Sequence, residues 1–558
     1  MIAVQSTTDA GLGALWENAK AYDCLLRFIR NQCPNQDAIL LAQCIRCIAT
    51  FAANHHCGRF ADGAIENPLM EIGLKLEGVA RPLPKTSFDR QLPQRSSSCR
   101  HVLHVATNVS PIGGHTRTIE NWIANDPASA HSLYLTRQAS IPLRSELCSM
   151  LHSQQGGPML AWDRWSDLTN ALQLRRCAQH WADCIILHHS PNDVVPVIAL
   201  ATDDSPPVAI LNHADHVFWL GSSVADSLFN LRTMGAELSR DRRAAKHNLV
   251  LPIPLSNEEV LLSQADARVQ LGIAPDRIVY LSVGRADKYS PTHEHDFFVT
   301  ATKILDRVEH SQLIVVGPEP HEVLPRLSRE QQGRVLLPGG VADTSSFRAA
   351  ADIYIESFPF GSHTAALEAG RSGLPLVLAY YTPTPFFSSR SEWLDGIVSR
   401  PTTEAMYVDQ ACRLAQDAQA RKQAGQAVKQ QIAACHRGKA WRTDLRAALD
   451  HLESMTHAPA SIPVFEMKED EMDIATAQWH WEVDPTTVSA DAHRTALKWL
   501  QGSACHLRNQ GHYADSARLL WHLARHTRGS VAIQKQIFKL APHWAAGKLS
   551  CLLPFTRY

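Results

Sequence analysis

The spacing of apolar residues divides the chain into helical ends and a central part of α/β character. Apolar residues recur at helical spacing over residues 15–29 and 38–49, and a polar break at 31–35 separates the two segments. From residue 101 the pattern changes to short apolar runs, each followed by a polar turn and a helical segment. We therefore expect a helical N-terminal module followed by domains in which strands and helices alternate.

Buried strands are predicted wherever several β-prone apolar residues stand together. Strands that alternate with helices are typical of parallel, doubly wound sheets, in which ligands bind at the carboxyl ends of the strands. Residues 222–226, Ser-Ser-Val-Ala-Asp, are interpreted as the capped start of a helix. The predicted strands are residues 102–107, 132–136, 184–188, 208–212, 278–283, 312–316, 353–355 and 376–378.

Composition shifts predict the domain boundaries. A stretch rich in Pro, Ser, Gln and Arg ends near residue 100, residues 249–254 are extended and punctuated by proline, and residues 458–473 are a second linker with an acidic end. We expect a helical module at 1–82, a linker at 83–100, a first Rossmann-like domain at 101–254, a second at 255–455, and a linker with a helical tail at 456–558.

Length, charge and cysteine usage restrict the class of protein. A chain of 558 residues predicts two to four domains, and a formal charge of −1 favours no nucleic-acid partner. No apolar run approaches the length of a transmembrane segment, and no secretory leader is apparent. The 13 cysteines show no framework spacing, and Cys44 and Cys47 lie inside a predicted helix, so we expect buried thiols and a cytoplasmic location.

The first group of candidate site residues follows the predicted strand at 353–355. A loop that contains Gly361 leads into Ser362, His363 and Thr364, where a helix is predicted to begin. Backbone N–H groups and the positive end of the helix dipole at such a turn favour an anion, with diphosphate as the obvious candidate. Glu368 lies one helical turn further on and can accept hydrogen bonds from sugar hydroxyls.

Two further turns carry candidate residues. Gly113 and Gly114 follow the predicted strand at 102–107 and allow close approach of a ligand, with His115 at the start of the next helix. Arg285 and Lys288 follow the strand at 278–283, where a planar fork of donors and a mobile charge suit a diphosphate.

These segments together resemble the GT-B glycosyltransferases, particularly the branch of protein O-GlcNAc transferases and bacterial cytoplasmic N-glycosyltransferases. The resemblance covers roughly residues 100–455 and implies an α/β fold with two Rossmann-like domains facing a cleft, here with helical N- and C-terminal extensions. It implies a UDP-sugar donor whose phosphates meet Ser362, His363 and Thr364 and whose ribose meets Glu368. It further implies hexosyl or N-acetylhexosaminyl transfer with inversion and without a metal or cofactor, and it gives Lys288 the phosphate-binding role, with Arg285 as its helper.

Polar residues at the ends of the first domain's predicted strands are candidate acceptor contacts. They are His188, His189, His213 and Asp215. The spacing of residues 212–216 also suits a metal site, but no partner carboxylate site stands out, so acceptor contacts or structural hydrogen bonds are preferred. His115 is a candidate for acceptor positioning or proton removal, and a phosphate or helix-capping contact is its alternative role.

Other functions stay open at this stage. A retaining hexosyltransferase for polysaccharide or glycolipid synthesis is the enzymatic alternative, but that family places a glutamate eight residues before the ribose glutamate, where this chain has Phe360. A non-catalytic scaffold derived from the GT-B fold is the alternative outside enzymes. A dehydrogenase is disfavoured, because no Gly-x-Gly-x-x-Gly follows the first strand. Protein and carbohydrate both remain candidate acceptors.

Overall fold

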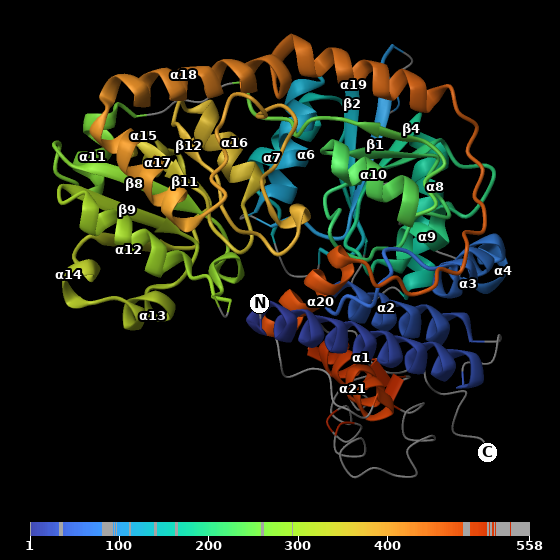
Figure 1. The fold of residues 1–558 in the computed structure, drawn as a ribbon. Helices are drawn as coiled ribbons and strands as arrows, with labels where there is room; N and C mark the ends of the chain where they lie inside the picture. The colour runs from blue at the N-terminus through green and yellow to red at the C-terminus, as the bar shows by residue number, and fades with distance from the viewer. Residues whose placement is uncertain are drawn as a thin grey trace.

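The computed structural model contains two parallel β-sheets, flanked by helices, and a separate helical layer (Figure 1). It describes residues 2–32, 37–80, 98–110, 113–138, 142–161, 166–257, 262–292, 294–483 and 492–509, together with isolated residues at 93, 95 and between 513 and 539. Both sheets are doubly wound and have a switch in strand order beside their first strand, which is where such sheets bind ligands.

The first sheet has the strand order β3-β2-β1-β4-β5-β6-β7 and all its pairings are parallel. Alternate residues of its central strand face opposite layers: Leu103 packs among α8 and α9, whereas Val102 packs against Trp122 of α6. The strands are β1 (Arg100–Ala106), β2 (Ser129–Leu135), β3 (Pro158–Leu160), β4 (Cys184–His188), β5 (Val208–Asn212), β6 (Ser227–Asn230) and β7 (Asn248–Val250). The helices are α6 (Gly114–Asn125), α7 (Ser145–Ser153), α8 (Asp167–Trp181), α9 (Val194–Leu200) and α10 (Thr233–Arg242).

The second sheet has the order β10-β9-β8-β11-β12 and is also parallel throughout. Its two faces are buried in separate apolar clusters, one around Leu281 and Leu367 and the other around Tyr280 and Phe298. The strands are β8 (Ile278–Val283), β9 (Ser311–Val316), β10 (Val335–Gly339), β11 (Ile353–Ile355) and β12 (Leu376–Val377). The main helices are α11 (Gln264–Leu271), α12 (Phe297–Arg307), α15 (Ser345–Ala350), α16 (His363–Arg371), α17 (Glu404–Gln416) and α18 (Ala418–Cys435).

Helix α19 (Gly438–Glu453) returns from the second sheet to the first. It continues the direction of α18 across the top of both sheets in Figure 1. Trp441 is buried against Trp122, and its indole N–H donates to the carbonyl oxygen of Pro252 at 2.7 Å. This segment lies within the range 255–455 predicted for the second domain, but its apolar face packs on the first. A local pattern shows that a helix is amphipathic but not which sheet it covers.

The N-terminal and C-terminal helices form one layer beneath the first sheet (Figure 1). Helices α1 (Ile2–Gln32) and α2 (Ala38–Asn54) lie beside α20 (Glu471–Val483) and α21 (Ala492–Asn509), so the two ends of the chain build a single module. α3 (Gly63–Leu74) and α4 (Leu76–Val79) follow α2 and continue toward the first sheet. The sequence predicted both ends as helical but did not predict that they pair.

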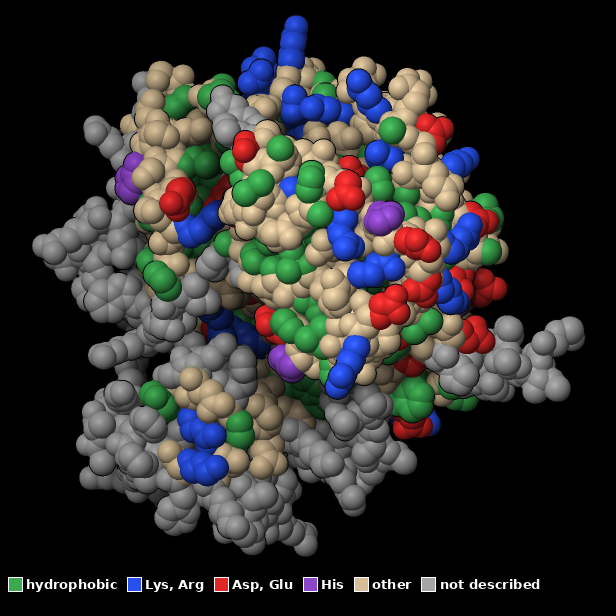
Figure 2. All heavy atoms as spheres, turned by 90° about the vertical axis from the view of Figure 1, so that its left-hand side faces the viewer, with side chains coloured by type: hydrophobic (Ala, Val, Ile, Leu, Met, Phe, Trp, Pro, Cys, Tyr) green, Lys and Arg blue, Asp and Glu red, His purple; other side chains and the backbone are tan. Residues whose placement is uncertain are grey.

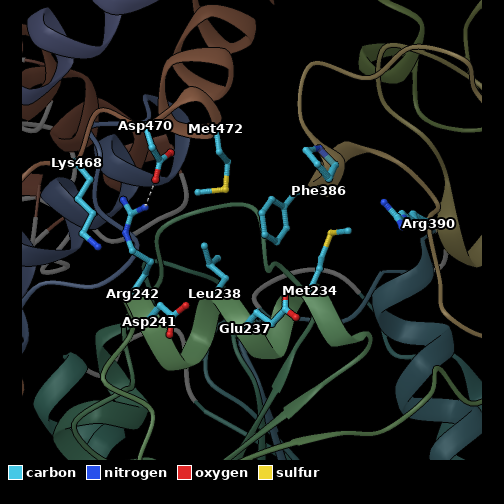
Figure 3. Close-up of a pocket in the computed structure, with 11 residues that line it drawn as sticks. Met234, Glu237, Leu238, Asp241, Arg242, Phe386, Arg390, Lys468, Asp470 and Met472 are labelled. Carbon is cyan, nitrogen blue, oxygen red and sulfur yellow. Dashed lines mark hydrogen bonds and ion pairs between the residues drawn. The ribbon is translucent and has the colours of Figure 1, made fainter. Parts of the chain in front are cut away.

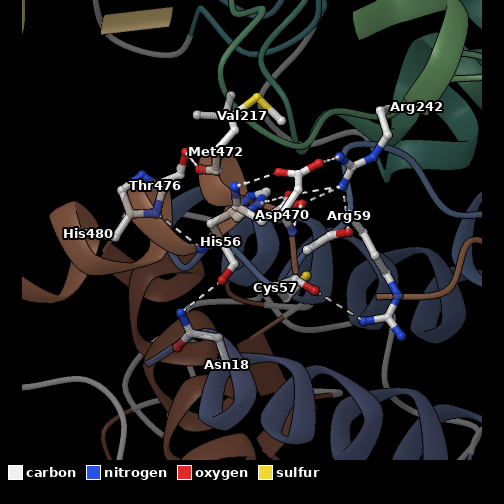
Figure 4. Close-up of polar contacts among 12 residues, drawn as sticks. Asn18, His56, Cys57, Arg59, Val217, Arg242, Asp470, Met472, Thr476 and His480 are labelled. Atoms are coloured by element: carbon white, nitrogen blue, oxygen red, sulfur yellow. Dashed lines mark hydrogen bonds and ion pairs between the residues drawn. The ribbon is translucent and has the colours of Figure 1, made fainter. Parts of the chain in front are cut away.

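A buried polar network fastens this helical layer to the first sheet (Figure 4). The Asp473 carboxylate of α20 accepts from Arg242 of α10 at 2.9 Å and lies 2.7 Å from the His56 ring. Burial opposes ionisation of Asp473, but His56 and Arg242 outweigh it and hold the pKa of the carboxyl at about 2. Arg242 also donates to the carbonyl oxygen of Gly58 at 3.0 Å, so one guanidinium joins three segments.

Most predicted strands are confirmed, and one element is wrong. The predicted strands at 184–188, 208–212, 278–283 and 353–355 coincide with β4, β5, β8 and β11. Residues 222–226 make a single turn and lead into β6 rather than a helix. The Asp226 carboxylate, expected to cap a helix, instead accepts from the Val208 N–H at 2.8 Å and holds β6 beside β5. The linker expected at 83–100 and the end of the tail lie largely outside the described residues.

The described surface gives two further facts. On the face of the second sheet domain shown in Figure 2, basic and acidic side chains are interspersed. Among the described helices, none is both long enough and apolar enough to cross a bilayer.

Candidate active site

The two sheets approach each other through the N-termini of α6 and α16. A Cβ atom at Gly114 would lie 3.0 Å from Thr364 Oγ1, so a larger residue there would require Thr364 to move by a few tenths of an ångström, and the two helix starts are closely packed. Gly113, just before α6, has a φ of 128°, a conformation that favours glycine. The positive ends of two helices therefore converge at one point of the cleft.

The start of α16 presents polar side-chain atoms that are buried and unused. Ser362 Oγ and His363 Nε2 have no hydrogen-bond partner among the described residues. Burial, reinforced by the nearby Arg232, holds the pKa of His363 well below its usual value, so the ring is neutral at pH 7 and can donate through one nitrogen. Because unpaired buried polar atoms are costly, this pair indicates a ligand-binding position.

Lys288 lies over the same turn. Its ammonium donates to the carbonyl oxygen of Gly361 at 2.8 Å and lies 4.5 Å from the centre of the Phe360 ring. Burial and the neighbouring Arg285 lower the pKa of Lys288 to about 8. The Arg285 side chain itself is 76% exposed and pairs with Asp287 at 2.9 Å, so it lies at the rim rather than in the turn.

Glu368 already carries an ion pair that spans the cleft. Arg117 of α6 donates to both of its carboxylate oxygens, at 2.7 and 2.9 Å, and Arg348 lies 3.4 Å from one of them. Arg117 also donates to the carbonyl oxygen of Ala342 at 2.6 Å. This pair is not predictable from the sequence, because Arg117 and Glu368 are 251 residues apart and come from different domains.

His115 is held in one tautomer by the backbone. Its Nε2 lies 2.6 Å from the carbonyl oxygen of His188, and a carbonyl can only accept, so Nε2 carries the hydrogen. Burial lowers the pKa of His115, which keeps the ring neutral and leaves Nδ1 as its basic nitrogen.

Three of the four residues predicted as acceptor contacts are engaged inside the protein. His188 uses both ring nitrogens in contacts with His104 and His213, each at 2.9 Å. His189 donates to the carbonyl oxygen of Leu220 at 2.5 Å. Both oxygens of Asp215 accept from Arg232, at 2.6 and 3.0 Å.

His213, the fourth of these residues, is half-buried beside His115, with ring centres 4.5 Å apart. His213 engages Nε2 with His188, and the half-buried His189 likewise engages only one ring nitrogen, so these two of the four are the most available to an acceptor in the described part of the chain. In the described part of the chain, no group of three or more His, Cys, Asp or Glu side chains is arranged to hold a metal ion.

Two groups that the sequence analysis did not select shape the site. Arg232 donates to the carbonyl oxygens of Phe386 and Ser388, at 2.7 and 2.8 Å, and so ties the second domain's aromatic loop to the first domain. Trp479 of α20 packs on Phe360, with ring centres 5.6 Å apart, and Phe360 in turn covers Lys288. The helical layer thus contacts the turn that carries the candidate site.

A second hollow opens where three parts of the chain meet (Figure 3). This cavity of about 440 Å³ lies between α10, the loop at 385–390 and the start of α20. Its walls mix apolar side chains, methionines among them, with charges of both signs. The lining residues are Met234, Glu237, Leu238, Asp241, Arg242, Pro385, Phe386, Arg390, Lys468, Asp470 and Met472.

A family comparison agrees with this geometry. Residues 277–417 match the model for the glycosyl transferases of group 1, and this region contains Lys288, the turn at 362–364 and Glu368. The second sheet domain therefore contains a glycosyl transferase region of group 1. A search of curated proteins gives no match to the sequence.

Solved structures with a similar arrangement share little sequence with this glycosyltransferase. An O-GlcNAc transferase from Thermobaculum terrenum is 14% identical over 74% of this chain and 77% of that chain, with a TM-score of 0.47. HepE from Anabaena, solved with UDP-glucose, is 15% identical over 63% of this chain and 99% of that chain, with a TM-score of 0.48. Of these similarities, the family match over residues 277–417 is the one that bears on the class of activity.

Proposed function

We propose that this glycosyltransferase moves a hexose or N-acetylhexosamine from UDP to a protein acceptor, with inversion at the anomeric carbon. The carrying observation is the start of α16, where Ser362 Oγ and His363 Nε2 are buried without a partner among the described residues, next to the Lys288 ammonium. This set of donors suits a diphosphate, which brings several anionic oxygens and needs hydrogen bonds to all of them.

The donor half of the mechanism is electrostatic. As the bond between the sugar and UDP breaks, negative charge grows on the diphosphate oxygen that leaves. The N–H groups at the start of α16, the Lys288 ammonium and the Ser362 hydroxyl stabilise that charge, so a metal ion is not required for this role. Donors fixed before the reaction are worth about 3 kcal/mol each in such sites.

Glu368 binds the ribose in this proposal and keeps its ion pair with Arg117. A carboxylate has about four lone-pair positions, so it can accept from the guanidinium and from ribose hydroxyls together. Arg117, at 2.7 Å, would fix the orientation of the carboxylate and hold the two domains in the closed arrangement.

The acceptor half lies on the opposite side of the cleft. His115 and His213 come from the first domain, whereas the diphosphate turn comes from the second. A base on one side of the sugar and a leaving group on the other side favour direct displacement and hence inversion. His115 Nδ1 is basic and His213 is half-buried, so this pair positions the acceptor and takes up its proton.

The cavity between α10, the loop at 385–390 and α20 supports a protein acceptor. Methionines and a phenylalanine adapt to varied side chains, and charges of both signs suit a polypeptide better than an uncharged glycan. The helical layer forms one wall, which gives the terminal helices a role in acceptor binding.

Retention is the alternative stereochemical outcome, and one contact speaks against it. The position eight residues before Glu368 is occupied by Phe360, whose ring lies between Lys288 and Trp479 rather than offering a carboxylate. Glu356, the nearest upstream acid, is buried and accepts from the N–H groups of Ala379 and Ser389, at 2.8 and 3.1 Å.

The proposal is tested by incubating the purified protein with a panel of UDP-sugars and a mixture of peptides. We expect UDP release with one sugar, a mass increase of one sugar on peptide, and a new anomeric proton with the configuration opposite to that of the donor. A retained configuration would contradict inversion, and transfer to glycans alone would contradict the protein acceptor. If no UDP-sugar binds, the non-catalytic scaffold is the correct account.

A further inference from the structure

Four histidines of the first domain form a continuous chain across one face of its sheet. His131 lies on β2, His104 on β1, His188 at the end of β4 and His213 just after β5. The register pairs Val102 with His131, Ala106 with His188 and Ile186 with Ala209, so all four side chains point to the same face. Successive ring nitrogens lie 3.0, 2.9 and 2.9 Å apart, which leaves no space for a metal ion between them.

The hydrogen bonds of this histidine chain run in one direction. His131 Nε2 lies 3.1 Å from the main-chain carbonyl oxygen of Asp126, which can only accept, so Nε2 carries the hydrogen and Nδ1 accepts. Each neutral ring has one donor nitrogen and one acceptor nitrogen. Because His131 Nδ1 accepts, His104 must donate through Nε2, and by the same reasoning His188 and His213 also carry their hydrogen on Nε2. His213 Nδ1 is left as a basic nitrogen with no hydrogen-bond partner among the described residues.

The two ends of the chain differ in chemistry. His213 is half-buried in the cleft beside His115, whereas His104 and His131 are fully buried. At the other end, the Asp126 carboxylate lies 3.4 Å from His131 Nε2 and is 13% exposed. The four histidines therefore connect the cleft with Asp126, which lies just before β2.

Burial keeps the interior of this chain neutral. It holds the pKa values of His104, His188 and His213 well below their usual value, and Trp122 packs edge-on against the His104 ring. Burial opposes ionisation of Asp126, but His131 outweighs it and lowers the pKa of that carboxyl, which Ser129 and Arg100 also face. A row of neutral, hydrogen-bonded histidines that ends at a carboxylate can transfer a proton without leaving a charge on any buried ring.

We propose that these four histidines are a proton relay that carries the acceptor's proton from the cleft to Asp126. As the acceptor oxygen or nitrogen forms its bond to the anomeric carbon, its own bond to hydrogen breaks and that proton passes to His213 Nδ1. Each ring then donates its Nε2 hydrogen to the next Nδ1, and His131 protonates the Asp126 carboxylate. The electron pair of the broken bond between the sugar and UDP leaves with UDP. After product release, the same transfers in the reverse direction return the proton to water in the cleft and restore the starting tautomers.

This inference rests on the proposed glycosyl transfer and assigns His213 as the group that receives the proton, with His115 positioning the acceptor. Its main test is Asp126→Asn, which keeps the main-chain carbonyl and removes only the final proton acceptor. We expect kcat to fall at least about tenfold with unchanged KM values for both substrates. Asp183→Asn is the matched control, because Asp183 contacts His101 on β1 at 3.2 Å, outside the relay, and its kcat should not change.

A second variant tests the interior of the relay. Gln at position 104 can donate and accept hydrogen bonds but cannot pass a proton through, so His104→Gln should lower kcat as far as Asp126→Asn does. The double variant should show no further loss. The dependence of kcat on deuterium content should indicate several moving protons in the wild type and fewer in either variant. Wild-type kcat in both variants, or additive losses, would overturn the relay.

An observation independent of catalysis separates this inference from the proposed function. Nitrogen-15 spectra of the histidine rings should show His104, His131, His188 and His213 all with the hydrogen on Nε2. An Nδ1 hydrogen on any of them would overturn the relay, whether or not the protein transfers sugar. Absence of transfer by the wild type together with the expected tautomers would contradict the proposed function and remove the role of the relay with it.

Discussion

Two polar clusters at the cleft, one in each sheet domain, differ in how far their side chains are paired. In the first domain, Asp215 is bound by Arg232 and His188 has both ring nitrogens engaged, although the neighbouring His189 Nδ1 has no partner among the described residues. In the second, Ser362 and His363 keep atoms without a partner among the described residues. Because unpaired buried groups reduce stability, they persist where a ligand supplies the missing partner. This difference makes the start of α16 the candidate donor site, whereas Asp215 and His188 of the first domain already have partners within the protein.

The comparison predicts that changes in the second domain reduce activity without loss of stability. Lys288→Ala should lower kcat/KM about 100-fold or more, because the charge that faces the leaving diphosphate is lost. The thermal unfolding temperature should hardly change. Lys303→Ala is the control, since Lys303 pairs only with surface Glu404 at 2.7 Å. An equal fall in kcat/KM for the two variants, measured by UDP release, would contradict a specific role of Lys288.

In the first domain we expect substitutions of paired polar residues to reduce stability rather than activity. Asp215→Asn leaves the buried Arg232 guanidinium without its counter-charge, and the free energy of unfolding should fall by about 3 kcal/mol. Asp241→Asn removes an exposed pair with Arg240 and should leave the free energy of unfolding nearly unchanged. Denaturant titration of both variants measures the difference. A small effect at Asp215 would show that its pairing does not stabilise this domain.

The pH dependence of donor binding sharpens the role of Lys288. Its pKa is lowered to about 8, so the ammonium is present below that pH and is lost above it. We expect the KM for UDP-sugar to rise as the pH passes 8, by up to about tenfold per pH unit. Lys288→Arg stays charged throughout, so its KM should remain constant from pH 7 to about 9.5. A wild-type KM that is flat over this range would place another group at the diphosphate.

The smallest expected effect concerns the helical layer. Trp479 contacts Phe360 and Phe387, with ring centres 5.6 and 4.6 Å apart, so Trp479→Ala should loosen the turn over Lys288. We expect the KM for UDP-sugar to rise about fivefold, in line with the loss of one or two aromatic contacts. Trp481, which is 45% exposed on the same helix, is the control, and Trp481→Ala should leave KM unchanged.

Local patterns in the sequence predict the elements well and their long-range partners poorly. The apolar runs at β4, β5, β8 and β11 mark strands because buried parallel strands need continuous apolar residues. The turn at 222–226 shows the limit: the Ser223 N–H donates to the Glu66 carboxylate and the Asp226 carboxylate accepts from the Val208 N–H, so neither takes part in starting a helix. The placement of α19 on the first sheet depends on contacts that no local pattern encodes.

The same limit applies to the site. Lys288, Ser362, His363 and Glu368 can be selected as candidates from the sequence because each stands at the end of a predicted strand or the start of a predicted helix. His104 and His131 are not, because a histidine within an apolar strand reads as an isolated polar residue. One signal was present in the sequence. Side chains alternate along a strand, and His104 and His131 both fall on the face of the sheet to which Val102 points and which α6 covers. Arg117 could not be assigned to Glu368 without the approach of the two domains.

Calorimetric titration of the wild-type protein with UDP and with uridine tests the central claim most directly. The account places the diphosphate at the start of α16 with Lys288, so UDP should bind about 100-fold more tightly than uridine, as two charge-assisted hydrogen bonds of about 1.5 kcal/mol each imply. Equal affinities for UDP and uridine, or no binding of UDP, would contradict it.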